Sequence, residues 1–557
     1  MRKKWTTLLF PLLFVLVFSV IAACANTPSE PVEENPSAGK EPASPSEPAN
    51  QQPEENPDNN GSDKTSAEND TVDNPDNDPL DEQPVSEPAG PANPSLKFTY
   101  PDAVRGIYVT GNSAGGSRFD TLVQLVKSSD LNAMVIDIKD DWGNVTYIPE
   151  GTPYVDAGKP LIKDPESVLK TLSENNIYPI ARIVVFKDTV LAKKRPDLSY
   201  ISSNGALWTN GRGEAFVNPF LKEVWDYNIG IAKEAAKLGF QEIQFDYVRF
   251  PEGFERRDES LTYSLGSYEN QTPTRFVKLE AEYKEKMEAY QKQFAQLSQK
   301  RDKAKAIYDE AVSQLNAAKA NNQSNTEDAN VHNNTPSGNQ SAETESNKDQ
   351  NELEAIEQKI KEAKVAWDKT EEDLKNLEKS KPKEPNFSNK ERLVQLRVDA
   401  VTDFVAYAKR ELEPLGVKVS VDIFGYTATL PAGAPGIGQD FVRISDQVDV
   451  ISSMIYPSHW TSYFGIAKPD KEPYRLVQEY AKVEKEKLSQ LSDPPISRPW
   501  IQDFTASWLG QGNYISYGKR EVEAQIRALN EAGIKEFLIW NAGNNYTENV
   551  DYTPLQP

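Results

Sequence analysis

Short apolar runs alternate with amphipathic helical patterns eight times between residues 104 and 541. Each run is bounded by turn residues, and this pattern predicts buried strands. The predicted strands are 104–110, 133–140, 178–186, 242–250, 418–426, 449–456, 499–504 and 536–541. Strand and helix repeated eight times over roughly 300 residues, leaving one insertion aside, predict an α/β fold of the (β/α)8 TIM barrel class.

The helical patterns between the runs support this prediction. They include 121–128, 165–175, 222–238, 391–412 and 519–532. The last two are followed closely by Gly416 and Gly533, and glycine is common just past a helix end. A doubly wound open sheet is the alternative. The glycine-containing stretch 111–116 lacks the G-x-G-x-x-G spacing, which disfavours a dinucleotide-binding version of that sheet.

An insertion of different character, residues 255–389, separates the fourth strand from its helix. Apolar residues recur at heptad spacing in both of its limbs, while 321–350 between them is polar and of low complexity. This pattern predicts a long antiparallel coiled-coil hairpin with a disordered tip. The apolar stripe suits the hairpin's own core; self-association or contact with a protein partner is the alternative use. The barrel is thus predicted in two parts, 96–254 and 390–557.

The amino terminus has the form of an export signal. Arg2, Lys3 and Lys4 precede an apolar run, 8–23, that is short for a membrane span. The run ends Ile-Ala-Ala-Cys24, which resembles the lipobox of bacterial lipoproteins, where the signal is cut before a cysteine that then carries a diacylglycerol. We therefore expect a signal peptide at 1–23, lipidation of Cys24 and an extracytoplasmic, membrane-anchored protein. An ordinary signal peptide beside an incidental cysteine is the alternative.

Composition restricts the chemistry of the rest. Residues 24–95 are rich in Pro, Glu, Asp, Asn and Ser, and they predict a disordered acidic tether. The single cysteine excludes an intrachain disulfide, and two histidines exclude zinc sites built on several imidazoles, so we expect neither metal nor cofactor. The net charge of -23 disfavours nucleic acid as a partner.

Polar and aromatic residues follow the predicted strands at their carboxyl ends, which converge on one face of such a barrel. The candidates are Tyr108, Asp137, Lys139, Asp141, Arg182, Asp246, Arg249, Asp422, Tyr456, His459, Gln502, Asp503, Trp540 and Asn541. Carboxyl groups beside aromatic rings suit a sugar. Glycoside cleavage needs one carboxyl group to protonate the leaving oxygen and another to attack or to activate water.

These strand ends also carry a resemblance. The motifs are VRGIYV at 104–109, IDIKD at 136–140, FDYVRFP at 245–251, VDIFG at 421–425, YPSH at 456–459 and WN at 540–541. With them the chain resembles a bacterial family named as a putative glycoside hydrolase domain. It is more remotely similar to α-amylase-type barrels, whose nucleophile and third acid would correspond to Asp246 and Asp503. The sequence departs from that type at two positions. It has Gln244 where α-amylase-type barrels have an arginine, and Asp422 where their acid is a glutamate.

Position and resemblance together assign the catalytic pair to Asp246 and Asp422. Adjacent barrel strands lie about 5 Å apart, so their terminal carboxyl groups can form either a retaining or an inverting pair. We expect Asp246 to be the nucleophile or base, kept ionised by Arg249 and Lys139, and Asp422 to be the acid. The remaining candidates would bind substrate. Alternatively, Asp246 caps the following loop, and Asp422 anchors the loop at Gly425.

The sequence thus predicts a glycoside hydrolase acting on an extracellular or envelope polysaccharide. A non-catalytic glycan-binding or cell-wall scaffold lipoprotein is the main alternative. A carbohydrate esterase or deacetylase is a third, disfavoured by the scarcity of histidine.

Replacing the predicted lipidation site, Cys24→Ser, should release the protein from the membrane or leave its signal uncut, with the barrel unchanged, because the tether separates the two. Membrane fractionation and the electrophoretic size of the processed chain would measure this. A variant that is processed normally and still sediments with the membrane would contradict the lipobox interpretation.

Overall fold

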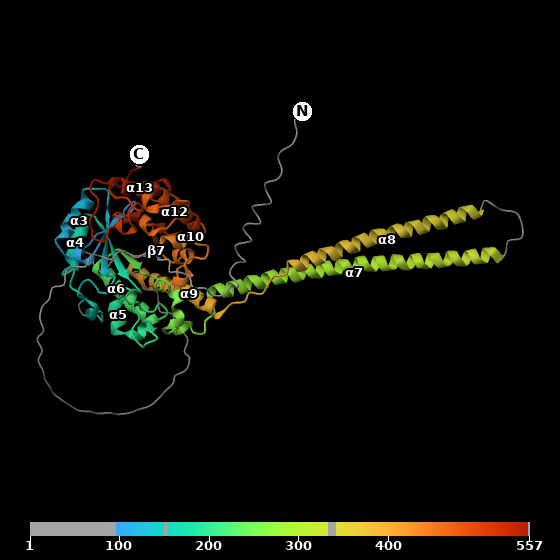
Figure 1. Cartoon of the computed structure of the whole chain (residues 1–557), viewed down its shortest axis with the longest axis horizontal. Helices are drawn as coiled ribbons and strands as arrows, with labels where there is room; N and C mark the ends of the chain where they lie inside the picture. Colours follow the sequence, from blue (N-terminus) through green and yellow to red (C-terminus); the bar gives the residue numbers. More distant parts are fainter. Residues whose placement is uncertain (1–95, 150–152, 332–340, 555–557) are drawn as a thin grey trace, which may run out of the picture. The chain divides into compact units, whose positions relative to one another are not determined.

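The computed structural model describes residues 96–149, 153–331 and 341–554. The predicted signal peptide, Cys24 and the tether up to residue 95 lie outside this part of the chain. Its centre is a barrel of eight parallel strands surrounded by helices (Figure 1). The strands are β1 (Arg105–Val109), β2 (Ala133–Lys139), β3 (Tyr178–Val184), β5 (Glu242–Asp246), β7 (Lys418–Phe424), β8 (Val450–Met454), β10 (Trp500–Gln502) and β11 (Phe537–Trp540).

Closure of the sheet excludes the doubly wound alternative. Each strand pairs in parallel with the next, and Trp500 of β10 pairs with Met454 of β8 to complete the ring. A two-residue strand, β9 (Ile496–Ser497), extends the β8 edge before β10. The (β/α)8 barrel is therefore confirmed, and all eight predicted strands are present.

Alternation along the strands explains why these runs form a barrel. On β5, Ile243 and Phe245 pack outward among the apolar residues under the helices. Gln244 points inward, where its amide lies 3.2 Å from the hydroxyl of Ser452 on β8. The inner apolar cluster includes Val135, Ile180, Trp500 and Leu538. One face of each strand thus fills the barrel while the other binds the helices.

Ten helices of the described residues accompany the barrel strands. They are α2 (Gly111–Ala114), α3 (Arg118–Lys127), α4 (Pro165–Glu174), α5 (Thr189–Lys194), α6 (Lys222–Leu238), α9 (Asn389–Leu412), α10 (Gly425–Thr429), α11 (Phe441–Ser445), α12 (Pro473–Leu488) and α13 (Lys519–Glu531). The five predicted helices are confirmed with small shifts at their ends. No helix of the described residues combines the length and the apolar character needed to span a bilayer.

The fourth strand is shorter than predicted. It was expected over 242–250 but ends at Asp246, because Tyr247 adopts a left-handed backbone conformation with φ of 51°. An extended strand cannot continue through such a residue. The chain therefore turns away directly after Asp246, which places that carboxyl group at the end of the barrel.

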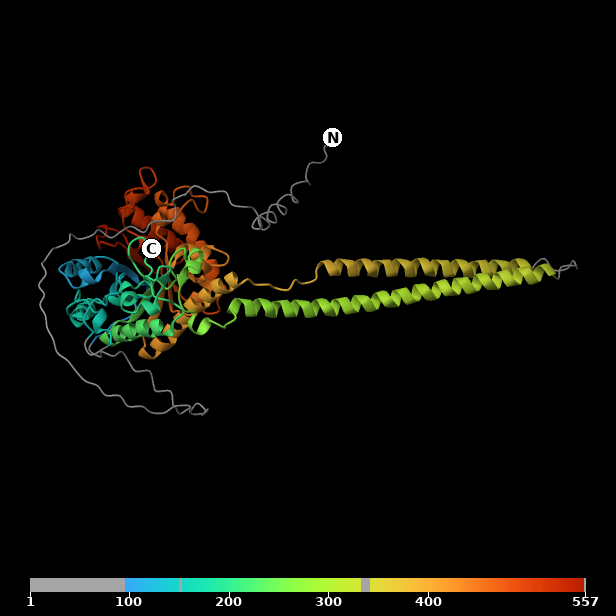
Figure 2. The ribbon, with the colours of Figure 1, turned by 60° about the horizontal axis from the view of Figure 1, so that its bottom comes forward.

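The insertion contains two long helices, α7 (Thr274–Val331) and α8 (Ser341–Lys379), which lie side by side (Figures 1 and 2). Rings of Tyr308 and Trp367 meet between them at 5.5 Å. At the base, Phe276 stacks on Phe387 at 3.6 Å. The coiled-coil geometry stays a prediction, and part of the predicted disordered tip, 332–340, lies outside the described residues.

The first residues of the predicted insertion pack on the barrel. Asp258 forms a buried ion pair of 2.9 Å with Arg397 of α9. The hydroxyl of Tyr268 donates to Asp403, also on α9, at 2.7 Å. A short strand, β6 (Leu261–Thr262), pairs with β4 (Ile201–Ser202). The segment of the insertion whose contacts are mainly within the insertion is therefore shorter than the predicted range 255–389.

Replacing residues 278–385 by a short Gly/Ser linker should leave a barrel that unfolds cooperatively, because the linker need only join the stacked Phe276 and Phe387. Removal of the whole of 255–389 should instead destabilise the barrel by about 3–5 kcal/mol, because Arg397 would stay buried without Asp258. Urea unfolding followed by circular dichroism would measure both. Equal stability of the two deletions would contradict this boundary.

Candidate functional site

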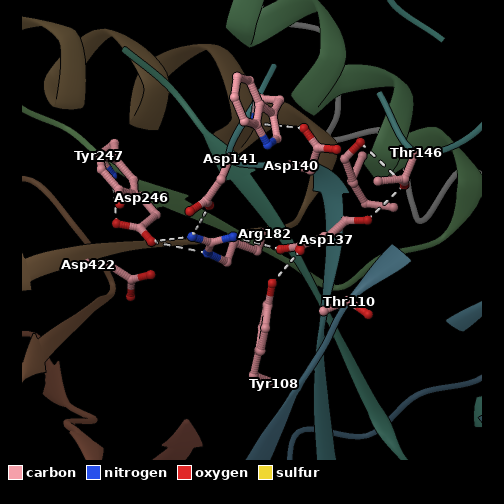
Figure 3. A network of polar contacts seen from close by, with 12 residues as sticks. Tyr108, Thr110, Asp137, Asp140, Asp141, Thr146, Arg182, Asp246, Tyr247 and Asp422 are labelled. Carbon is pink, nitrogen blue, oxygen red and sulfur yellow. Dashed lines mark hydrogen bonds and ion pairs between the residues drawn. The ribbon is translucent and has the colours of Figure 1, made fainter. Parts of the chain in front are cut away.

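A buried arginine organises the carboxyl ends of the strands. Arg182 on β3 is 1% exposed, and its guanidinium contacts three aspartates (Figure 3). Nη1 lies 2.7 Å from Asp137, while Nη2 lies 2.9 Å from Asp141 and 2.6 Å from Asp246. The forked shape of guanidinium suits several carboxylates at once. Strands β2, β3 and β5 are neighbours, so the ends of adjacent strands supply all four groups.

Two of the three aspartates, Asp137 and Asp141, have pKa values shifted in opposite directions. Burial raises the pKa of Asp137 to about 7, with a further rise from the charge of Asp141, while Arg182 opposes both. Burial would also raise the pKa of Asp141, but Lys187 and Arg182 outweigh it and hold the pKa well below its usual range. The hydroxyl of Tyr108 donates to Asp137 Oδ2 at 2.5 Å. Asp137 can therefore exchange a proton near neutral pH.

Asp246 is held from both sides of its carboxylate. Oδ2 accepts from Nε of Arg182 at 3.1 Å as well as from Nη2, and Oδ1 accepts from the backbone amide of Tyr247 at 2.6 Å. The left-handed turn at Tyr247 brings that amide back to the side chain of the preceding residue. The carboxylate is 5% exposed and has a fixed orientation.

Asp422, at the end of β7, lies on the neighbouring strand and faces Asp246 in Figure 3. It is 2% exposed, and its Oδ1 accepts a hydrogen bond of 2.7 Å from the indole of Trp500. Burial raises the pKa of Asp422 well above its usual range, and the charge of Asp246 raises it further. Asp422 therefore binds its proton more tightly than an ordinary aspartate, and it lies beside a carboxylate paired with Arg182.

Aromatic rings form the other side of this cluster. Tyr108 and Trp540 stack at 4.1 Å, and the Arg182 guanidinium lies 5.5 Å and 5.4 Å from their ring centres. Tyr456 packs against Trp540 at 6.3 Å and against His459 at 5.3 Å. The structure thus brings the predicted residues Tyr108, Trp540, Tyr456 and His459 together on one side.

The structure corrects the placement of Lys139. Its Nζ lies 2.7 Å from Asp188 and 2.9 Å from Asn228 of α6, on the outer side of β2. In a regular strand, side chains two residues apart point to the same face, so Lys139 would lie on the same face as Asp137. The register of β2 against β3 shifts between these two residues. A bulge of this kind turns the next side chain to the other face. Arg182 is therefore the cation of Asp246 in place of Lys139.

Three other predicted residues, Gln502, Asp503 and Asn541, have mainly structural contacts. Asp503 accepts from the hydroxyl and the amide of Thr547, at 2.6 and 2.8 Å. The Asn541 amide group donates to the Asp503 carbonyl at 2.6 Å, and Gln502 donates to Asp470 at 3.0 Å. These bonds fix the loops after β10 and β11.

Arg249, which was expected to keep Asp246 ionised, lies in the turn after β5. Its guanidinium lies over the rings of Phe424 and Tyr247, at 4.6 and 4.7 Å, and 3.3 Å from Glu252. These contacts fix the turn that follows β5.

Three further residues of the cluster were not predicted. Lys187 Nζ lies 3.3 Å from Asp141, 2.9 Å from Glu214 and 3.2 Å from the hydroxyl of Tyr247. Lys187 directly follows the third predicted strand, so the strand-end criterion could have included it. Glu214 comes from a long loop, and Tyr247 alternates with Asp246 in phase with the apolar Ile243 and Phe245, so neither carried a signal. No group of three or more His, Cys, Asp or Glu within the described residues is arranged to hold a metal ion.

A sequence model of the family described as "Putative glycosyl hydrolase domain" matches residues 106–323 and 342–546. A hypothetical protein from Ruminiclostridium thermocellum is 41% identical, over 29% of this chain and 83% of its own, with a TM-score of 0.27. The glycoside hydrolase domain of PgaB (BpsB) from Bordetella bronchiseptica is 12% identical, over 79% of this chain and 94% of its own, with a TM-score of 0.42. No curated protein sequence matches the chain.

Asp137→Asn should make the free energy of unfolding less dependent on pH. The pKa of this group is about 7 in the fold against 3.8 for the unperturbed acid, so between these values the folded chain binds more protons than the unfolded one. Its stabilising contribution is complete below pH 3.8 and is lost as pH rises through 7. Between about pH 5 and 8 the wild type should therefore lose a few kcal/mol, roughly, relative to the variant.

Urea unfolding at several pH values would measure this difference. Asp446→Asn, an exposed change on the barrel surface, is the control and should keep the pH dependence of the wild type. Parallel curves for the wild type and Asp137→Asn would contradict the assignment.

Proposed function

Because this chain belongs to the family of putative glycosyl hydrolase domains, we propose that it hydrolyses the glycosidic bonds of an extracellular or envelope polysaccharide through Asp246 and Asp422. One observation carries the proposal: two neighbouring carboxyl groups have opposite environments. Asp246 is paired with Arg182, whereas burial and the charge of Asp246 raise the pKa of Asp422. Such a division supplies an acid and a base at one pH.

In this mechanism Asp422 donates its proton to the glycosidic oxygen as the bond to the anomeric carbon breaks. Asp246 either attacks that carbon or removes a proton from an attacking water. In the first route water then cleaves the bond between the sugar and Asp246, and the proton of that water returns to Asp422; in the second route Asp246 releases its proton to solvent and Asp422 takes one up from solvent. Both routes end with a free hydroxyl on each fragment. The indole N–H of Trp500 stabilises the Asp422 carboxylate that the proton leaves behind.

Arg182 acts by position and charge. Its ion pairs with Asp137 and Asp141 hold the guanidinium where it can orient Asp246. The stacked rings of Tyr108 and Trp540 would offer an apolar face to the sugar. Asp137, whose pKa lies near 7, would bind a sugar hydroxyl as donor or acceptor.

The proposal includes the location of the protein. Lipidation at Cys24 would hold it on the outer side of the bacterial cytoplasmic membrane, where the acidic tether gives it reach. The paired helices α7 and α8 would provide a surface for self-association or for a protein partner.

A glycan-binding protein without turnover is the second candidate. Both oxygens of Asp246 already accept hydrogen bonds within the chain, and Asp422 is almost fully buried. Such occupied groups could serve only to shape a binding surface. The two candidates differ in whether reducing ends are released.

Asp246→Asn and Asp422→Asn should each lower turnover by about two orders of magnitude or more. With an aryl glycoside whose leaving group needs no protonation, Asp422→Asn alone should recover activity, because only the acid step has become dispensable. The assay is release of reducing ends from purified envelope and biofilm polysaccharides.

Asp446→Asn, an exposed change on the barrel surface, is the control that should keep full turnover. Circular dichroism would establish that each variant is folded. Wild-type turnover in both active-site variants would refute the assignment, and no release of reducing ends by the wild type would favour the binding protein.

A further inference from the structure

Three aromatic side chains of the described residues are unusually exposed, and all three lie just beyond the carboxyl ends of barrel strands. Trp142 follows β2 and is 49% exposed, Tyr426 follows β7 and is 38% exposed, and Trp508 follows β10 and is 43% exposed. Burial of a large ring is normally favourable. Rings left open on the face that also carries Asp246 and Asp422 therefore point to a ligand there.

The order of the strands places these rings around the mouth of the barrel. Going round the sheet, β2 is separated from β7 by β3 and β5, and from β10 by β1 and β11. Only β8 lies between β7 and β10. Trp142 is therefore on one side of the mouth, and Tyr426 and Trp508 are on the other.

The backbone of Trp142 is rigid although its ring is exposed. Its amide donates to the Asp140 carboxylate at 2.9 Å, and its carbonyl accepts from the amides of Thr189 and Val190 at 2.9 and 3.1 Å. The next residue, Gly143, has φ of 97°, and a Cβ there would lie 2.0 Å from the Asp188 carboxylate. Only glycine fits this turn, so the backbone that carries the indole is held at a fixed place.

The other two rings are backed by aromatic side chains that lead to the catalytic cluster. Trp508 stacks on Phe504 at 5.8 Å, and Phe504 packs against Tyr456 at 6.1 Å, which in turn contacts Trp540. Tyr426 stacks on Phe424 at 5.3 Å.

Phe424 also connects Tyr426 to the cluster. It lies under the guanidinium of Arg249, which also covers Tyr247, the residue after Asp246. Tyr426 and Trp508 are thus each packed against a second ring and remain partly exposed to solvent.

We infer that Trp142, Tyr426 and Trp508 are sugar-binding platforms for one long polysaccharide chain that crosses the mouth of the barrel. The inference rests on the proposed function and specifies its substrate: a chain held on both sides of Asp246 and Asp422, and so cleaved internally. Sugar rings present apolar C–H faces that pack on aromatic rings, and the carboxylates between the platforms accept hydrogen bonds from hydroxyl groups.

The arrangement suits a glycan better than a protein. A stable protein interface buries a contiguous surface of roughly 800 Å² on each partner. Here the three exposed rings follow three different strands, and the partly exposed Asp141 directly precedes Trp142. Separate rings with polar groups near them suit a sugar chain.

The test is electrophoresis of the full-length chain, in detergent, through native gels that contain hydroxyethyl cellulose, mixed-linkage β-glucan, xylan, dextran or sonicated peptidoglycan. At least one polymer should retard the wild type. Trp142→Ala and Trp508→Ala should each weaken that binding about threefold to tenfold, as loss of one aromatic contact would. Ile307→Ala, an equally exposed apolar residue on α7, is the matched control and should bind as the wild type does.

Two results of the binding test would overturn the inference: no retardation of the wild type by any of these polymers, or unchanged retardation of the Trp142→Ala/Trp508→Ala double variant.

Hydrolysis is scored separately, and an internal cut should lower viscosity before many reducing ends appear. Platform-dependent binding without hydrolysis would refute the proposed catalysis and leave these rings as glycan-binding sites. Hydrolysis that releases only small products from chain ends would refute the crossing chain.

Discussion

The contact of one buried guanidinium with three carboxylates determines the geometry of the barrel mouth. Burying Asp137 and Asp246 without a cation would be prohibitive, since each isolated charge loses its hydration, and Asp141 beside them is partly exposed. Arg182 meets all three within 3 Å, at 2.7, 2.9 and 2.6 Å, and the rings of Tyr108 and Trp540 cover it. The ends of β2, β3 and β5 are thereby fixed relative to one another.

One cation among several acids cannot neutralise them equally, and the inequality gives the acids different properties. Asp141 is also close to Lys187, so its pKa is well below the usual range. Asp137 is buried and has only a share of Arg182, so its pKa rises to about 7. Burial raises the pKa of Asp422 well above its usual range and the charge of Asp246 adds to the rise, although the hydrogen bond from Trp500 opposes it. Burial and unequal contact with cations therefore give the acids the different proton affinities on which the proposed glycoside cleavage depends.

The barrel could be predicted because its signal is local: each strand and helix has its own periodicity, and eight repeats leave few architectures. Asp246, Asp422 and Arg182 could be predicted because they end such strands. Lys139 could not be placed, because the bulge that turns it outward depends on pairing with β3. The hydrogen bonds from Thr547 to Asp503 likewise come from a loop, and the two residues are 44 positions apart in the sequence. Contacts of that kind leave no pattern in the sequence near the residue concerned.

The opposite end of the barrel shows why surplus acid at the mouth is significant. There another buried arginine, Arg498, pairs with two carboxylates, Glu242 at 2.7 Å and Glu536 at 2.8 Å. Tyr100 completes that network by accepting a hydrogen bond of 2.8 Å from Arg498. At the mouth three carboxylates share Arg182, and Asp422 adds a fourth acid that forms no ion pair among its described contacts. This larger excess of acid raises the pKa of Asp422, because burial disfavours its charge and its carboxylate would lie beside that of Asp246. A proton bound in this way is the one that the proposed mechanism donates.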